Sequence, residues 1–192
     1  MKKLPLVFTS LILLSVSQLQ GCATAIVAGT VTAVSAANDP RSIGTQIDDS
    51  SIEVKALIEL MKNDGLDKHT HLNVISYNGA ILVVGQAPNQ FLIDTAIKIL
   101  KEIKGVKQIH NQVKLGTPVS FTTKTNDAWI TTKVKADLLT DDTVKGHDIK
   151  VVTENKKVYL MGLVSAEQGD KAAIIASGIP GVEGVIKVFE KQ

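Results

Sequence analysis

The chain has 192 residues, a formal net charge of +2 and a mean hydropathy of +0.17. Two of its lysines lie in the first 21 residues, which contain no acid, so the remainder carries 19 basic against 19 acidic residues. A chain without a basic excess cannot neutralise a run of phosphates, so no nucleic-acid partner is expected. About 170 residues suffice for one medium domain or two small ones.

Residues 1–21 are typical of a bacterial signal peptide. Two lysines precede the apolar run Leu4–Val16, which is shorter than the roughly 20 residues that cross a bilayer. The sequence Leu19-Gln20-Gly21 then precedes Cys22, the only cysteine, and resembles a lipobox. This resemblance implies diacylglyceryl transfer to the Cys22 thiol, cleavage after Gly21 and acylation of the new amine, with palmitate as the expected fatty acid.

The predicted anchor also indicates a location. Several acyl chains hold a protein firmly, because each buried methylene contributes about 0.8 kcal/mol. Ala23 follows the cysteine, whereas aspartate there is typical of lipoproteins kept in the inner membrane. We therefore expect a lipid-anchored protein of the outer membrane that faces the periplasm, with residues 22–45 as lipidated N-terminus and tether.

From about residue 46 the sequence repeats itself, which predicts two copies of one module. We expect a first domain at 46–115, a linker at 116–125 and a second domain at 126–192. An offset of 77 residues aligns the two copies, and it pairs Leu72-Asn73-Val74 with Ile149-Lys150-Val151, Asn78 with Asn155, Gly85 with Gly162, and Ile52 with Trp129.

Each copy predicts the order α-β-β-α-β. The first has helical spacing over 49–62, a strand at 71–76, the turn Tyr77-Asn78-Gly79, a strand at 80–85, a helix at 90–104 and a strand at 106–115. The second has a helix at 127–140, strands at 148–153 and 157–163, a helix at 166–178 and a strand at 182–190. This pattern predicts an α+β fold in which each three-stranded mixed sheet packs against two helices. The residues expected to face inward from the first module's helices are Ile52, Ala56, Leu57, Leu60, Met61, Phe91, Leu92, Ala96, Ile99, Leu100 and Ile103.

Modules of about 70 residues with this order, a central glycine after the hairpin's second strand and a Gly-Val pair before the last strand resemble the BON domain. Three strings, Asn38–Gln46, Thr125–Val134 and Tyr159–Val164, resemble the dual BON-domain outer-membrane lipoproteins. The resemblance implies a non-enzymatic protein without cofactors that supports envelope integrity and cell division. It also implies binding of anionic phospholipid such as phosphatidylglycerol, mainly through the second module.

The first helix of the second module carries the candidate lipid-binding residues. At about 100° per residue, Ile130, Val134 and Leu138 form the core stripe. Tryptophan favours the membrane interface and lysine attracts anionic headgroups. Lys135 is a secondary headgroup candidate. The predicted lipid-binding residues on the other face are Trp129, Thr132, Lys133, Ala136 and Leu139.

Two alternatives remain open for that face. Trp129 could fold over the edge of the sheet or pack against the first module, or the face could bind an envelope protein, which would make the chain an interaction adaptor. With Ile52 taken as the counterpart of Trp129, the corresponding face of the first module presents Lys55, Glu59 and Lys62 and is expected to be a poorer lipid surface.

Catalytic and metal-binding patterns are weak in this sequence. It contains neither Gly-x-Ser-x-Gly nor a glycine-rich phosphate loop. His69 and His71, near Asp64 and Asp67, would need a third fixed ligand to hold a metal, and the second copy has no matching histidines. We interpret them as exposed polar residues and expect no metal site and no enzymatic activity.

Overall fold

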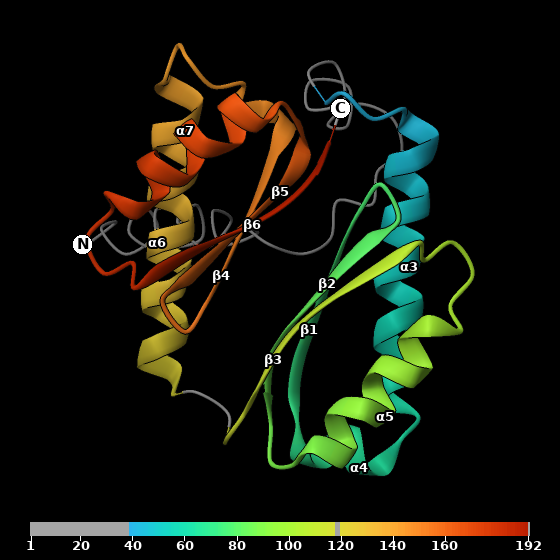
Figure 1. The fold of residues 1–192 in the computed structure, drawn as a ribbon. Coiled ribbons are helices and arrows are strands. Elements are labelled where there is room, and N and C mark those ends of the chain that lie inside the picture. Colours follow the sequence, from blue (N-terminus) through green and yellow to red (C-terminus); the bar gives the residue numbers. More distant parts are fainter. Residues whose placement is uncertain (1–38, 118–119, 192) are drawn as a thin grey trace, which may run out of the picture. The chain divides into compact units, whose positions relative to one another are not determined.

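The computed structural model describes residues 39–117 and 120–191 (Figure 1). The predicted signal peptide, the predicted lipidation site Cys22 and the tether as far as residue 38 lie outside these residues. The first module contains α3 (Ile43–Met61), α4 (Asp64–His69), β1 (His71–Tyr77), β2 (Ala80–Ala87), α5 (Gln90–Lys101) and β3 (Gln108–Leu115). The second contains α6 (Phe121–Thr140), the 3-10 turn η2 (Gly146–Asp148), β4 (Ile149–Glu154), β5 (Lys157–Val164), α7 (Ala166–Ser177) and β6 (Gly184–Lys191).

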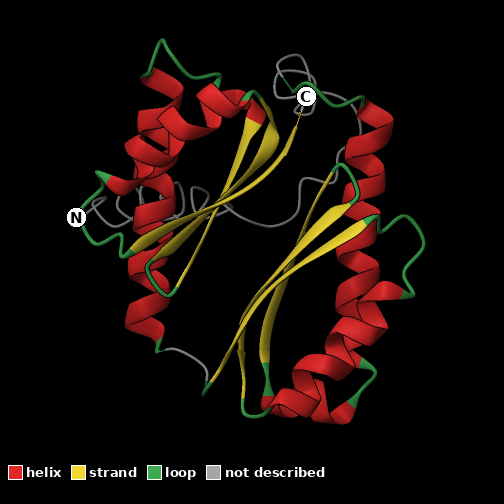
Figure 2. Cartoon of the chain, in the orientation of Figure 1, coloured by secondary structure: helices red, strands yellow, loops and turns green. Residues whose placement is uncertain are grey.

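The predicted α+β class is confirmed in both modules. In each sheet the central strand pairs antiparallel with the strand before it and parallel with the strand after it, giving the orders β1-β2-β3 and β4-β5-β6. The main helices of each module cover one face of its sheet (Figures 1 and 2). The short elements α4 and η2, which follow the first helix of each module, were not expected.

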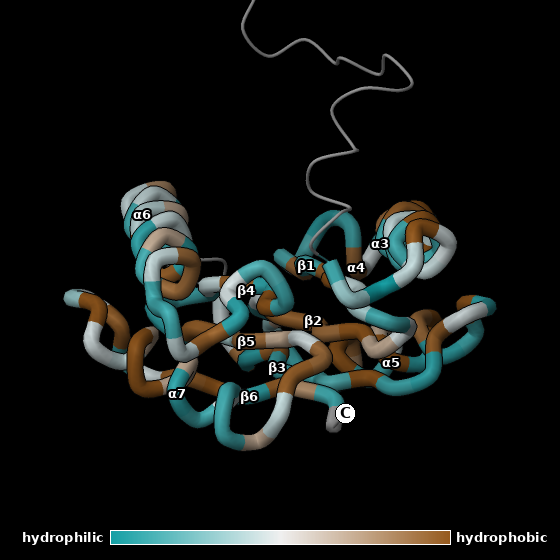
Figure 3. Tube along the Cα trace, turned by 90° about the horizontal axis from the view of Figure 1, so that it is seen from above, coloured by the Kyte–Doolittle hydropathy of each residue, from teal (hydrophilic) through white to brown (hydrophobic). Residues whose placement is uncertain are grey.

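Each sheet buries side chains on both faces. On the helix side of the first sheet, Ile81 and Val83 pack with Ile52 and Leu100, and the second module has a matching cluster around Ile130 and Leu160. Every residue of β2 is buried, and hydrophobic residues dominate that strand (Figure 3). A third buried cluster combines the opposite faces of the two sheets and contains Ile75, Tyr77, Leu82, Val84, Tyr159, Met161 and Val188.

The two first helices are related by an offset of 78 residues, not 77. Asp49 and Asp127 are both buried, and each accepts backbone N–H groups from the hairpin turn of its own module. Ile52 is therefore the counterpart of Ile130, and the predicted pairing of Ile52 with Trp129 is wrong. The loop that follows the helix differs between the copies, so the strands keep an offset of 77 while the helices do not.

Some expected inward positions are also wrong. Leu57 and Met61 of α3 are 57% and 55% exposed, and Phe91 of α5 is 74% exposed. Ile93 of α5 is buried instead. The side chain of Asn89 accepts the N–H of Leu92 and fixes where α5 begins, and this start directs Leu92 and Ile93 inward and Phe91 outward.

Tyr77 predicts a loss of stability at alkaline pH. It is 3% exposed, its hydroxyl donates to the Asp148 carbonyl at 3.2 Å, and burial raises its pKa from 10.0 to about 12. Burial also raises the pKa of Tyr159. Unfolding lowers these values, so the stabilisation is complete below pH 10 and is lost as the pH rises toward 12. The change for Tyr77 corresponds to at most roughly 2.7 kcal/mol.

This prediction can be checked by urea unfolding between pH 8 and 12. The free energy of unfolding should fall above about pH 10, and Tyr77→Phe should reduce the slope. An equal slope in Tyr77→Phe would show that other groups cause the loss.

Candidate functional site

The predicted lipid-binding residues lie on α6, which starts earlier than expected. Ser120 is the N-cap, and its hydroxyl accepts the N–H of Thr123 at 3.2 Å. The helix thus begins at Phe121, inside the segment 116–125 that was predicted as linker, and not at residue 127. A threonine-rich segment has low helix propensity, so the sequence alone suggested a connection there.

Burial fixes the rotation of α6 on the second sheet. Ile130 and Val134 are fully buried and Leu138 is 1% exposed, which confirms the predicted core stripe. Asp127 lies on the same side and accepts the N–H groups of Asn155 and Lys156 at 2.7 and 2.8 Å. Packing and a buried carboxylate therefore hold one face of α6 against the sheet and leave the other outside.

All five predicted lipid-binding residues are on the exposed side of the helix. Trp129 and Leu139 are each 51% exposed, and Thr132, Lys133 and Ala136 are exposed as well. Phe121, which the sequence analysis missed, is 83% exposed and lies at the same angle around the helix as Leu139. The capping pair Ser120 and Thr123 was the signal that could have found it. From Phe121 to Leu139 the face extends about 27 Å at 1.5 Å per residue.

The charge on this face is positive. Lys124, Lys133 and Lys135 are exposed, whereas Asp127 is buried and Asp137 pairs with Lys133 at 2.7 Å. Lys124 and Lys135 have no ion pair within the described part of the chain. An exposed pair of the Lys133 type contributes little energy, so Lys133 can exchange Asp137 for an external anion at small cost.

The corresponding face of α3 is more apolar than expected. With the offset of 78, the counterparts of the five residues are Ser51, Val54, Lys55, Ile58 and Met61. The expectation of an evenly charged face is therefore wrong. At 100° per residue, the exposed apolar residues of α3 fall within one stripe, and these are Ile43, Ile47, Val54, Leu57, Ile58 and Met61. The helix is nevertheless acidic, because Lys55 is its one cation against Asp48, Asp49, Glu53 and Glu59.

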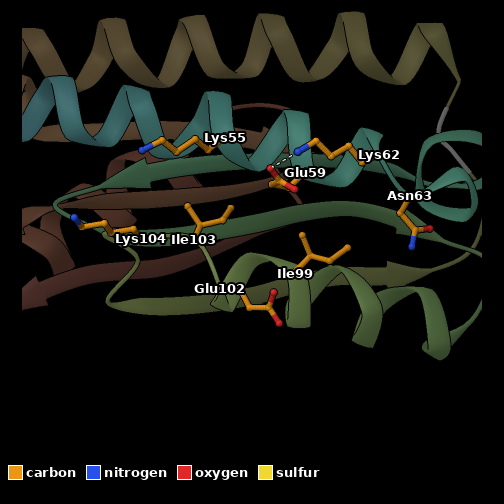
Figure 4. A pocket seen from close by; sticks show the side chains of 8 residues that line it. All are labelled: Lys55, Glu59, Lys62, Asn63, Ile99, Glu102, Ile103 and Lys104. Atoms are coloured by element: carbon orange, nitrogen blue, oxygen red, sulfur yellow. Dashed lines mark hydrogen bonds and ion pairs between the residues drawn. The ribbon is translucent and has the colours of Figure 1, made fainter.

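Lys55 and Glu59 of α3 line a hollow of about 480 Å³ between α3 and α5 (Figure 4). Lys55 and Lys104 extend to the same side of this hollow, while Lys62 pairs with Glu59 at 2.7 Å. Glu102 contributes a second carboxylate. Both signs of charge alternate over a floor of Ile99 and Ile103, so the hollow does not select one class of ion.

The two candidate histidines do not form a metal site. His69 ends α4 and His71 begins β1. Within residues 39–117 and 120–191, no group of three or more histidine, cysteine or acidic side chains is arranged to hold a metal ion. No helix within these described residues has both the length and the hydropathy of a membrane span.

The BON domain model matches residues 48–117 and 126–190, so the chain carries two BON domains. It is 41% identical over 172 residues to the outer membrane lipoprotein DolP of Haemophilus influenzae, which covers 90% of this chain and 89% of that protein. The chain therefore belongs to the family of dual BON-domain outer-membrane lipoproteins, and its place is the outer membrane.

Two further relatives match about three quarters of the chain or more. A protein of Actinobacillus pleuropneumoniae named 21 kDa hemolysin is 39% identical over 151 residues, covering 79% of this chain and 78% of that protein. Osmotically-inducible protein Y of Escherichia coli is 30% identical over 146 residues, covering 74% and 72%. None of the three names describes an enzyme.

Proposed function

We propose that this lipoprotein is non-enzymatic, binds anionic phospholipid through the exposed face of α6, and thereby supports outer-membrane integrity, including at division sites. The observation that carries the proposal is the composition of that face. Phe121, Trp129 and Leu139 are exposed beside Lys124, Lys133 and Lys135, and Asp137, the one acid on the helix that is not buried, is already paired.

The energies favour a surface contact of moderate strength. Burial of the exposed half of an indole, on the order of 100 Å², contributes roughly 2.5 kcal/mol. Each lysine near an anionic surface adds about 1 kcal/mol. An acyl anchor at Cys22 would hold the face close to the bilayer, so a weak contact would be populated through its high effective concentration.

Trp129→Glu is expected to remove this binding. The test uses the unacylated chain from residue 22 with Cys22→Ser, in co-sedimentation with vesicles of phosphatidylglycerol and phosphatidylethanolamine. Loss of indole burial should weaken binding roughly 70-fold, and the added charge should weaken it further. Ile174→Glu is the matched control, because Ile174 is 70% exposed on α7 and its variant should bind like the parent.

Further measurements distinguish lipid binding from the alternative, an adaptor that binds an envelope protein. Binding should decrease on phosphatidylcholine vesicles and with added salt, because both weaken the lysine contribution. If Trp129→Glu binds anionic vesicles as well as the parent, the lipid proposal fails. A discrete protein adduct from a photo-crosslinker at position 129 in cells would then favour the adaptor function for the same face.

A further inference from the structure

The first module has a free strand edge beside an apolar groove. β1 is an edge strand, paired only with β2. The Ser76 N–H donates to Glu53 Oε1 at 2.8 Å, and its carbonyl accepts from Lys150 Nζ at 3.1 Å, so both groups point away from β2. In an antiparallel pair this orientation recurs at every second residue. The N–H and C=O groups of Leu72 and Val74 therefore also point outward, and they have no partner within the described residues.

A groove runs between this edge and α3. Its main part, about 230 Å³, is lined by Val54, Leu57 and Leu60 of α3 and by Leu72 and Val74 of β1. A second part of about 130 Å³ shares Leu57, Leu60 and Leu72 and continues past Met61 to Asp67. Unpaired backbone groups and apolar side chains thus lie side by side along the groove.

The second module lacks this combination. Ile149 and Val151, the counterparts of Leu72 and Val74, are 6% and 4% exposed. The counterpart of Leu57 is Lys135, which puts a charge where the first module has an apolar wall. The groove is therefore a property of the first module and not of the repeated fold.

The charges around the groove disfavour an anionic ligand. Glu53 pairs with Lys150 at 2.8 Å, while Asp67 at the other end is exposed and has no ion pair within the described part of the chain. Glu53 and Asp67 are the two acids that line the groove, and with Glu53 paired, Asp67 carries its uncompensated negative charge. An anionic headgroup would be repelled here, whereas a lysine or arginine would be attracted to Asp67.

We propose that this groove binds an extended segment of a partner protein, which adds a strand to the free edge of β1. Backbone groups of the segment bond to Leu72 and Val74, and its alternate apolar side chains lie between β1 and α3. A basic residue of the segment lies next to Asp67. The proposal is independent of lipid binding by α6.

The direct test is a titration of the unacylated chain with a capped peptide, followed by backbone NMR shifts. The probe has about seven residues, with valine and threonine in alternation and a lysine at one end. Shifts should be confined to β1 and α3. Two further probes carry N-methyl groups on either the valines or the threonines. Because alternate N–H groups point to opposite sides, one methylated peptide should lose binding and the other should keep it.

Leu57→Lys is the matched protein variant, since it introduces the residue that α6 has at the equivalent position. This variant should bind the peptide with an affinity at least about tenfold lower than the parent, which corresponds to 1.4 kcal/mol. Ile174→Lys on α7 should bind like the parent. Val74→Pro removes an outward N–H together with a side chain that lines the groove, and it should weaken binding without loss of the β1–β2 ladder.

Several results would overturn the proposal. If both methylated peptides lost the same amount of binding affinity, simple adsorption to an apolar surface would be indicated. Unchanged binding of the peptide by Leu57→Lys would indicate the same. Shifts of the groove residues with short-chain phosphatidylcholine at concentrations where no peptide binds would make the groove an acyl-chain site. Absence of binding by all three peptides would also exclude strand addition.

Discussion

Gly85→Ala is expected to prevent the first sheet from forming. Gly85 lies in the central strand β2 with a φ of +122°, and a Cβ at this position would overlap the carbonyl oxygen of His71. His71 and Gly85 both lie in the paired backbone of β1 and β2, so neither can move without breaking the β1–β2 ladder. We expect a loss of more than about 4 kcal/mol in the free energy of unfolding, with loss of the dispersed NMR signals of the first module.

Gly184→Ala is the control for this experiment. Gly184 is also a strand residue, but a Cβ there would meet no atom within 4 Å. The free energy of unfolding of Gly184→Ala should lie within about 1 kcal/mol of the parent value, because glycine in a strand is itself less stable than alanine by about that amount. If the two alanine variants had the same urea midpoint, the close approach of His71 would not determine the residue at position 85.

Asp49→Ala is expected to cost about 3–5 kcal/mol of stability. The Asp49 carboxylate is 3% exposed and accepts four hydrogen bonds at 2.6–2.8 Å, from the Ser76 hydroxyl, the N–H groups of Asn78 and Gly79, and Arg41. Alanine would leave the Ser76 hydroxyl and the two N–H groups of the turn without this acceptor, while Arg41 would keep Asp39. Urea unfolding measures the loss directly.

The adjacent residue provides a strict comparison. Asp48 has the same charge and lies on the same turn of α3, but it is exposed and no hydrogen bond to its side chain is found among the described residues. Asp48→Ala should change the free energy of unfolding by less than about 0.5 kcal/mol. Equal effects at both positions would mean that net charge, and not the bonds to the hairpin turn, accounts for the result.

The order of the elements could be predicted because its signals are local. Asn78-Gly79 marks the first hairpin, where both residues have positive φ, and Asn155 and Lys156 mark the second. The start of α6 was missed because its one signal is the N-cap Ser120, which accepts the N–H of Thr123 within a threonine-rich segment whose composition is typical of a connection. Phe121 was missed as an exposed residue for the same reason.

The exposed side of α6 could be predicted, while that of α3 could not. α6 has one apolar stripe of helical spacing, so the remaining residues had to face outward. α3 has two, Ile52-Ala56-Leu60 and Val54-Ile58-Met61, and either could have packed on the sheet. The bonds from Asp49 to the hairpin turn decide between them, and these join residues about 30 positions apart. The offset of 77 in place of 78 shifted each expected counterpart on α3 by one residue, which is 100° around the helix. The apolar face of α3 was therefore not recognised.

The buried cluster between the two sheets has a consequence for dissecting the molecule. A module expressed alone would present its half of that cluster to water, including Ile75, Tyr77, Leu82 and Val84 in the first module. Such a fragment would tend to self-associate through this surface. If a half-length fragment lost membrane or partner binding, self-association through this newly exposed apolar surface could cause the loss as readily as the absence of the other module. Point variants in the intact chain therefore show more directly which module carries each binding activity.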